Sequence, residues 1–152
     1  GRLENVDTGR NFSVFIDYAH TEDALKNVLE ALRQVSEARV IVVFGCGGDR
    51  DKTKRPQMGK VAAQLADMAI VTNDNPRSED PQSIMDQIIS GFSKKNYQVI
   101  PSREEAIRKA VGMAKTRDVV LIAGKGHEGY QIFKDKTVPF NEREIVERCL
   151  RS

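Results

Sequence analysis

Two runs of β-branched and aliphatic residues constrain the fold of this chain more than any other feature. Residues 39–44 read RVIVVF and residues 118–123 read DVVLIA. After the first residue of each run, apolar side chains occupy consecutive positions, so both faces of the strand must be buried. Strands of this kind belong to parallel sheets with helices on both sides. The two runs therefore predict an α/β protein.

Weaker strand and helix patterns alternate around these runs. Further short strands are expected at residues 12–16, 68–72 and 98–100. Helices are expected from a Thr21 cap to about residue 35, then at about 56–66, 81–92 and 102–115. Residues 130–140 predict a strand or a hairpin that turns at 134–136, and Asn141 with Glu144 opens a last helix. We expect a Rossmann-like, doubly wound, mostly parallel sheet with helices on both faces, formed by one domain over residues 1–152.

Composition excludes several classes of protein. The 152 residues, 39% of them hydrophobic and 30% charged, are typical of one globular domain. A net charge of +2 argues against a dedicated nucleic-acid binder. No apolar run approaches the roughly 20 residues of a membrane span. Two cysteines do not make a disulfide framework, and the first five residues do not resemble a signal peptide. We therefore expect a cytoplasmic protein with neither nucleic-acid nor membrane partners.

Four polar or glycine-rich segments each follow a predicted strand. They read DYAHT at 17–21, GCGGDRD at 45–51, NDNPR at 73–77 and GKGHEG at 124–129. The carboxyl ends of parallel strands meet at one edge of a sheet, where open α/β folds bind their ligands. Turns collect Gly, Asn and Asp in any protein. Four such segments at the same edge nevertheless predict a binding site.

Neither glycine-rich segment matches a nucleotide-binding fingerprint. Asp51 stands where a P-loop needs glycine, and Arg50 holds the third glycine position of G-x-G-x-x-G. GKGHE has no Ser or Thr after Lys125. The basic residues that follow GCGGDRD form either a solvated face or a secondary phosphate contact, and they are Lys52, Lys54 and Arg55.

Other reactive residue types give weaker signals. No metal-ligand spacing links the histidines, cysteines and acids of these segments, namely His20, Cys46, Asp49 and His127. Cys46 has no recognisable base, and Cys149 on the last helix is expected to be buried. His127 is a donor, a base or a turn residue.

The NDNPR segment places a rigid turn before an arginine. Pro76 has a fixed φ and limits where Arg77 points. A guanidinium aimed in advance suits bidentate capture of a carboxylate or phosphate. The alternative is an exposed turn in which Arg77 pairs with Glu79 or Asp80. In GKGHE the glycines allow close backbone approach to a ligand, and Glu128 suits a ligand ammonium.

The four segments, in this order, resemble the C-terminal domain of the Mur ligases over nearly the whole chain. DYAH alone is shared with folylpolyglutamate synthetase relatives, whereas FGCGGDRD together with GKGHE is narrower. DNPR is narrower still, because in this family it accompanies the use of meso-diaminopimelate. The resemblance therefore implies one branch of the family.

The activity that the resemblance implies is that of an ATP-dependent ligase in peptidoglycan precursor synthesis. Such enzymes phosphorylate a carboxylate of UDP-MurNAc-L-Ala-D-Glu and join meso-diaminopimelate to it through an acyl phosphate. The family places the P-loop, the Mg²⁺ sites and the UDP site in two other domains. We therefore expect ATP and Mg²⁺ to be held mainly outside this sequence, no catalytic or metal residue within it, and no activity from it alone. Alternatives are a ligase for L-lysine or lanthionine, or a non-catalytic small-molecule-binding module.

The resemblance also assigns candidate site residues by motif position. The diaminopimelate contacts are expected at Arg50, Asp74, Asn75, Pro76, Arg77, Gly124 and Glu128. The two arginines suit a distal carboxylate, and Glu128 with the Gly124 carbonyl suits the neighbouring ammonium. The residues expected to face the nucleotide are Arg2, Asp17, Tyr18 and His20. Of these, Asp17 or Arg2 is expected at the ribose and Tyr18 or His20 near the base.

Overall fold

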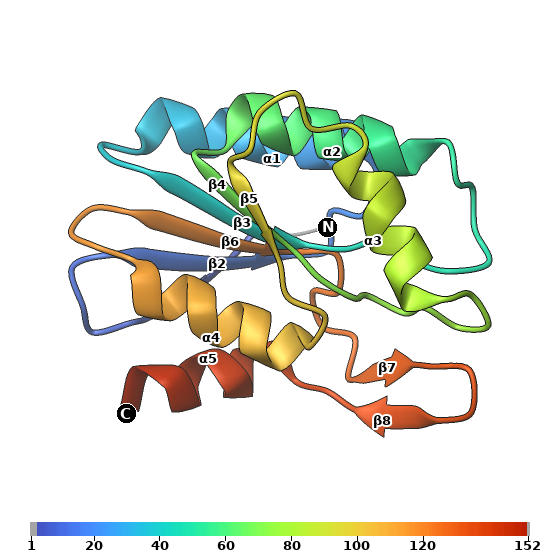
Figure 1. Cartoon of the computed structure of the whole chain (residues 1–152). Helices are drawn as coiled ribbons and strands as arrows, with labels where there is room; N and C mark the ends of the chain where they lie inside the picture. The colour runs from blue at the N-terminus through green and yellow to red at the C-terminus, as the bar shows by residue number, and fades with distance from the viewer. Residues whose placement is uncertain (1–2, 152) are drawn as a thin grey trace.

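A computed structural model describes residues 3–151 and shows a layered α/β fold (Figure 1). Its strands are β1 (Glu4–Val6), β2 (Ser13–Asp17), β3 (Val40–Phe44), β4 (Met68–Val71), β5 (Tyr97–Val99), β6 (Val119–Ala123), β7 (Tyr130–Ile132) and β8 (Thr137–Pro139). Its helices are α1 (Glu22–Val35), α2 (Lys54–Leu65), α3 (Pro81–Ile89), α4 (Arg103–Met113) and α5 (Glu142–Arg151). The alternation of strands and helices expected from the sequence is confirmed.

The main sheet has the strand order β1-β2-β6-β3-β4-β5. The five strands from β2 to β5 in this order run parallel, and β1 pairs antiparallel with β2 at one edge. Every residue of β3 and β6 is buried, as their uninterrupted apolar runs predict. Strand β1 was not predicted, because its three residues bury only Val6 fully and show no useful periodicity.

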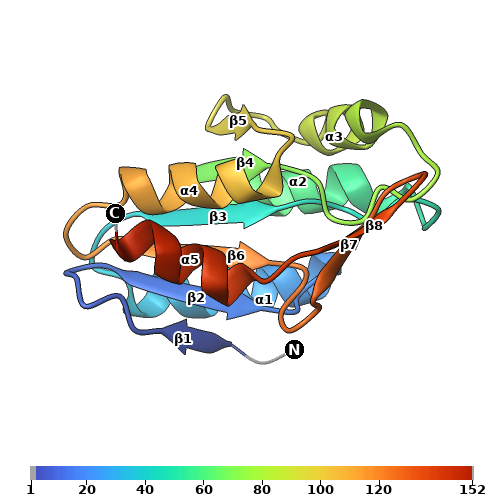
Figure 2. The same ribbon diagram turned by 90° about the horizontal axis from the view of Figure 1, so that it is seen from below.

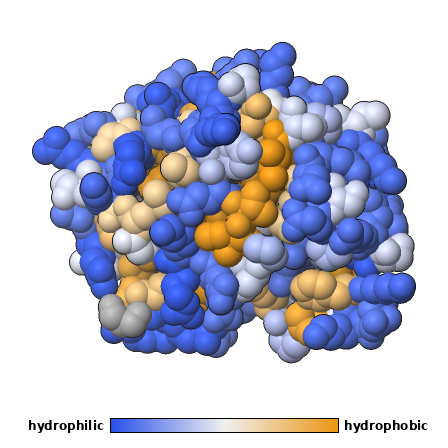
Figure 3. All heavy atoms as spheres, in the orientation of Figure 1, coloured by the Kyte–Doolittle hydropathy of each residue, from blue (hydrophilic) through white to orange (hydrophobic). Residues whose placement is uncertain are grey.

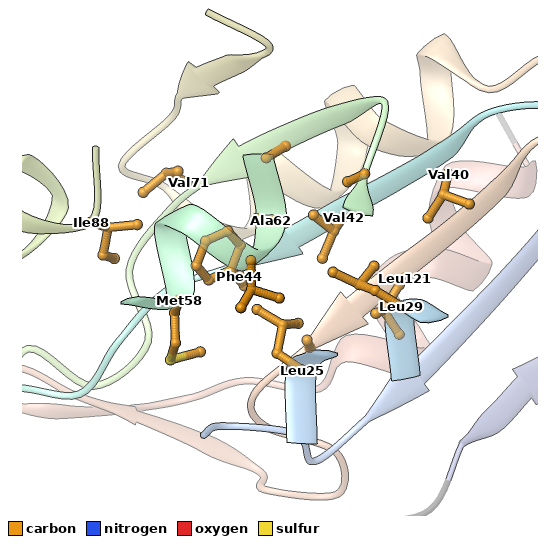
Figure 4. Close-up of a cluster of buried hydrophobic side chains, with 14 of the residues drawn as sticks. Leu25, Leu29, Val40, Val42, Phe44, Met58, Ala62, Val71, Ile88 and Leu121 are labelled. Atoms are coloured by element: carbon orange, nitrogen blue, oxygen red, sulfur yellow. The ribbon is translucent and has the colours of Figure 1, made fainter. Parts of the chain in front are cut away.

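Helices cover both faces of the sheet, as predicted. On one face, Leu25, Leu29 and Leu32 of α1 form a helical stripe against β3 and β6, together with α2 and α3 (Figure 4). On the other face, α4 and α5 pack against β2, β3 and β6 (Figure 2). The core is therefore two apolar layers, and the fully buried strands β3 and β6 between them leave only their ends near the surface.

Local capping signals set several helix starts. Thr21 accepts a hydrogen bond from the Ala24 amide, and Ser102 accepts one from the Glu105 amide. Asn141 likewise accepts from the Glu144 amide at the start of α5. These three starts agree with the sequence analysis.

Two helices end earlier than predicted. Helix α3 stops at Ile89, not near residue 92. Just beyond it Gly91 lies against the backbone of α2, where an added Cβ would be 1.9 Å from the Pro56 carbonyl oxygen. Helix α4 ends at Met113, where the chain becomes extended at Ala114.

The β7–β8 hairpin forms a separate two-stranded sheet, turning at the residues predicted for it. It projects beyond the carboxyl ends of β3 and β6 (Figure 2). The face shown in Figure 3 is mainly hydrophilic, with an apolar streak near its middle and smaller apolar areas at its left side and lower right. Among the described helices, none is both long and apolar enough to cross a membrane.

A fully buried ion pair joins the last two helices to the strand ends. Arg103 Nε on α4 lies 2.5 Å from Glu142 Oε2 on α5, and both side chains are completely buried. The same guanidinium donates to the carbonyls of Asn73 and Ala123, which end the strand regions of β4 and β6. The pair therefore fixes the starts of the NDNPR and GKGHEG segments from the side of the sheet that α4 and α5 cover.

We expect Arg103→Met to lower the free energy of unfolding by about 3–5 kcal/mol, because it leaves Glu142 buried without its partner. Urea denaturation of the chain measures this loss. Arg108→Met is a matched control in the same helix, since Arg108 pairs with Glu104 at the surface and should lose about 1 kcal/mol or less. Equal losses for the two variants would contradict this account of the pair.

Candidate functional site

The four polar segments follow β2, β3, β4 and β6, which are neighbours in the sheet. They converge on one cleft of about 330 Å³, within the range of about 300–1,000 Å³ typical of small-molecule sites. Eight predicted site residues line it: Tyr18, His20, Arg50, Asp74, Asn75, Arg77, Gly124 and Glu128. The prediction that one sheet edge gathers these segments is confirmed.

A larger groove of about 640 Å³ runs along α4 between Ile100 and Met113. It is lined by one face of α4 together with Ile100, which follows β5, and none of the four polar segments contributes to it. The edge cleft instead gathers polar groups from four different loops around one volume. Convergent polar groups of this kind characterise ligand sites, so we take the smaller cleft as the candidate site.

The turn after β4 places Arg77 in an unusual backbone conformation. Its φ is +54°, in the left-handed region that side-chain-bearing residues rarely adopt. The Arg77 amide donates to the Ile132 carbonyl, and Nη1 donates to the Gly48 carbonyl at 2.9 Å. A Cβ on Gly48 would lie 1.8 Å from the Pro76 carbonyl oxygen, so glycine is required there. This packing aims the arginine across the GCGGDRD segment.

Glu79 does not pair with Arg77, one of the alternatives left open by the sequence, but with Arg55. Arg55 is fully buried and donates to both Glu79 oxygens at 2.8 and 2.9 Å and to the Gly47 carbonyl at 2.9 Å. The expectation that Arg55 belongs to a solvated basic face or contacts phosphate is therefore wrong. Its guanidinium is used inside the protein, where it ties the loop after β3 to the turn after β4.

The Arg55 guanidinium holds the pKa of Glu79 down to about 2 by hydrogen bonding, well below the ordinary value of 4.5. Because the pKa is lower in the folded state, the carboxylate stabilises the fold above pH 4.5. This contribution is lost as the pH falls from about 4.5 towards 2.

We expect Glu79→Gln to lower the melting temperature at about pH 6, with the difference from the parent shrinking steadily below about pH 4.5. Thermal denaturation at a series of pH values measures it. Glu30→Gln, which removes an exposed carboxylate from α1, controls for the general change in charge. A Glu79→Gln difference that stays constant down to about pH 2 would refute the assignment.

Lys125 is the central residue that sequence reasoning missed. Its side chain is fully buried, and its ammonium lies 2.7 Å from Asn75 Oδ1, 2.9 Å from the Tyr130 carbonyl and 3.0 Å from Asp74 Oδ1. Glu128 Oε1 is 3.5 Å away. Its signal in the sequence is a lysine inside a glycine-rich loop near acidic motif residues, a pattern that by itself points only to a P-loop, which GKGHE does not match.

The GKGHE loop lies directly beside the DYAHT segment. Gly124 has a φ of +120°, and its amide donates to the Asp17 carbonyl at 3.0 Å. Gly126 has a φ of +55°, and a Cβ there would come within 3.1 Å of the Tyr18 side chain. His127 is 86% exposed near Glu4 and is not among the cleft-lining residues.

The residues expected to face a nucleotide are placed differently from one another. The Asp17 carboxylate is buried and accepts from the Ala19 amide at 2.7 Å, so it shapes the loop. Tyr18 and His20 are exposed at the cleft, with their rings edge to face and centroids 4.6 Å apart. The nearby negative charge of Glu128, as the largest cause, raises the pKa of the Tyr18 phenol above its ordinary value of 10. Arg2 lies outside the described residues.

The two cysteines give no sign of nucleophilic chemistry. Burial raises the pKa of the Cys46 thiol to about 12, so the thiolate is scarce at neutral pH. Cys149, which was expected to be buried, is only partly so, at the margin of the core between α4 and α5. Within residues 3–151, no three metal-binding side chains cluster together.

Comparison with known proteins identifies the family. The profile described as "Mur ligase, glutamate ligase domain" matches residues 1–126. The chain belongs to the Mur ligase family. It is 57% identical over 152 residues to UDP-N-acetylmuramoyl-L-alanyl-D-glutamate–2,6-diaminopimelate ligase of Caldanaerobacter subterraneus subsp. tengcongensis, covering 99% of this chain and 32% of that protein. The Clostridium botulinum protein of the same name is 52% identical over 153 residues, with the same shares covered.

A solved structure of a ligase with this name has a TM-score of 0.93 and 38% sequence identity. The match covers 99% of this chain and 31% of that one. The Rossmann-like fold expected from the sequence is thus confirmed for this Mur ligase domain. The chain spans about a third of the length of these relatives.

The cleft of this Mur ligase domain is lined by both positively and negatively charged side chains. Arg50 and Arg77 bring guanidinium groups to its lining, and Asp74 and Glu128 bring carboxylates. Pro76, which was also predicted as a contact, shapes the turn without lining the cleft. A ligand with both a carboxylate and an ammonium would match this arrangement.

Proposed function

We propose that residues 1–152 form the C-terminal domain of a ligase that joins meso-diaminopimelate to UDP-MurNAc-L-Ala-D-Glu in the cytoplasm. Relatives that are 57% and 52% identical to this chain over the aligned third of their length carry that ligase activity in their names. The domain would bind the incoming amino acid and close over ATP. It would depend on the remainder of the full-length protein for catalysis.

The observation that carries this proposal is the pairing of opposite charges in one cleft. The far end of diaminopimelate carries a carboxylate and an ammonium. Arg77, aimed by its left-handed backbone and its bond to Gly48, suits the carboxylate together with Arg50. Glu128 and the Gly124 carbonyl suit the ammonium.

The proposed reaction forms one amide bond at the expense of ATP. The γ-phosphoryl group of ATP passes to a carboxylate of the UDP-linked dipeptide and leaves ADP. The amine of diaminopimelate then attacks the acyl carbon, phosphate departs, and the amine gives up a proton. This chain's share is to hold the amine-bearing substrate so that its near end meets the acyl phosphate.

ATP and Mg²⁺ would be held mainly by the remainder of the protein. On this chain the exposed rings of Tyr18 and His20 fit a contact with the adenine base. Asp17 supports that loop from below, and Arg2 would complete the nucleotide-facing group. Asp74 and Glu128 already contact the ammonium of Lys125, so the ammonium of a ligand suits the same side of the cleft. Among residues 3–151, no three side chains that could hold a metal ion lie together.

Selectivity against L-lysine would come from rejection as much as from attraction. Lysine has no distal carboxylate, so its binding would leave the guanidinium of Arg77 desolvated without an anion. An unpaired buried charge of this kind costs about 2–5 kcal/mol. The same cost favours diaminopimelate over every amino acid with an uncharged end.

We expect Arg77→Ala in the full-length protein to raise the KM for meso-diaminopimelate at least about thirtyfold, because it removes the partner of the distal carboxylate. The preference over L-lysine should shrink with it. Steady-state ligation assays with each amino acid measure both effects.

Arg117→Ala is the matched control for this test. Arg117 is also an arginine with positive φ, but it lies before β6, at the end of the strands opposite to the cleft.

If the parent enzyme prefers L-lysine or lanthionine, the chosen amino acid is wrong. If it binds no amino acid, a non-catalytic binding module becomes the better account.

A further inference from the structure

We propose that Lys125 is a positioning residue that turns the amide of Asn75 towards the amino-acid substrate and sets the charge of the acidic side of the cleft. This inference rests on the proposed function, because it concerns the same site. Lys125 is fully buried and is not among the residues that line the cleft. Any effect it has on a ligand must therefore pass through its neighbours.

The first of those neighbours is the side-chain amide of Asn75. Its Oδ1 accepts from the Lys125 ammonium at 2.7 Å and from the Ile132 amide at 3.1 Å. A carbonyl oxygen accepts two hydrogen bonds, and an NH₂ group in its place would face two donors. The two contacts therefore hold Oδ1 towards Lys125 and the Ile132 amide, and turn Nδ2 towards the cleft. Because Asn75 lines the cleft, its Nδ2 is left as a donor for a substrate carboxylate.

The second effect of Lys125 is on the charge of the cleft. Its ammonium neutralises one of the two carboxylates beside it, Asp74 and Glu128, and leaves one net negative charge. Asp74 Oδ1 lies 3.0 Å from the ammonium yet makes no hydrogen bond of good geometry within the described part of the chain. Because this oxygen is itself buried, a ligand does not reach it, and it is the remaining negative charge that matches a single ligand ammonium.

The hairpin fixes Lys125 itself. The Tyr130 carbonyl on β7 accepts from the ammonium at 2.9 Å, and Gln131 on the same strand donates to the Asp74 carbonyl at 2.8 Å. The loop after β4, the loop after β6 and the hairpin thus meet at one buried cation. We therefore expect removal of this cation to change the binding of the substrate more than it changes the stability of the sheet.

The first test is Lys125→Met in the full-length protein. We expect the KM for meso-diaminopimelate to rise about tenfold to hundredfold, as a lost charge-assisted hydrogen bond implies. The KM values for ATP and for the UDP-linked dipeptide should stay within about twofold. A purely structural lysine would instead reduce the melting temperature and the active fraction and leave the KM of the surviving enzyme unchanged. Lys95→Met, an exposed lysine in the loop before β5, is the matched control.

A double-mutant cycle tests whether Lys125 acts through Asn75. If it does, Lys125→Met combined with Asn75→Ala should raise the KM much less than the product of the two single effects. Independent contributions would multiply, and that result would contradict the positioning role.

Asn75→Asp keeps the inference testable if Lys125→Met fails to fold. An aspartate retains an acceptor for Lys125 and Ile132 but replaces the NH₂ group that faces the cleft with an oxygen. We expect a KM for meso-diaminopimelate raised at least tenfold in a protein that still folds. An unchanged KM would show that the amide does not donate to the substrate.

Failure of this inference can be told apart from failure of the proposed function. A parent enzyme that ligates meso-diaminopimelate, with Asn75→Asp and Lys125→Met variants of unchanged KM, contradicts only the role of Lys125. A parent that binds no amino acid in calorimetry contradicts the proposed function and this inference together.

Discussion

Burial of β3 and β6 on both faces is the constraint on which the rest of the structure depends. Helices must cover each side of these strands, so only the ends of β3 and β6 reach solvent. Parallel pairing then brings the ends of β2, β6, β3 and β4 to one edge. This pairing is why residues more than 100 positions apart in the chain, such as Tyr18 and Glu128, line the same cleft.

Three buried cations give that edge a definite shape. Arg103 holds the ends of β4 and β6 from the α4–α5 layer, Arg55 ties the loop after β3 to the turn after β4, and Lys125 joins that turn to the hairpin. Each is paired with a carboxylate, as buried charges must be. These three cations make the ion pairs that hold the loops together. Arg50 and Arg77 line the cleft without a carboxylate partner among the ion pairs of residues 3–151, so they can bind a ligand.

Local pattern was enough to predict most elements and the gathering of the four segments. The starts of α1 and α4 follow from Thr21 and Ser102, whose side chains act within three residues. The burial of Arg55 could not be read from KTKR, because it depends on Glu79, 24 positions away. Lys125 depends in the same way on the distant Asn75 and on the docked hairpin. Sequence spacing reveals which residues share an edge, but long-range pairing decides which of them face a ligand.

The most direct test of the central claim is a titration of the isotope-labelled chain with meso-diaminopimelate and separately with L-lysine, followed by amide chemical shifts. The account predicts shifts at Arg50, at Asn75 and Arg77 and at residues 124–128 with diaminopimelate, and much smaller ones with lysine. The same titration of the full-length protein with an ATP analogue extends it to the assembled site. Equal responses to the two amino acids, or shifts confined to the groove along α4, would contradict it.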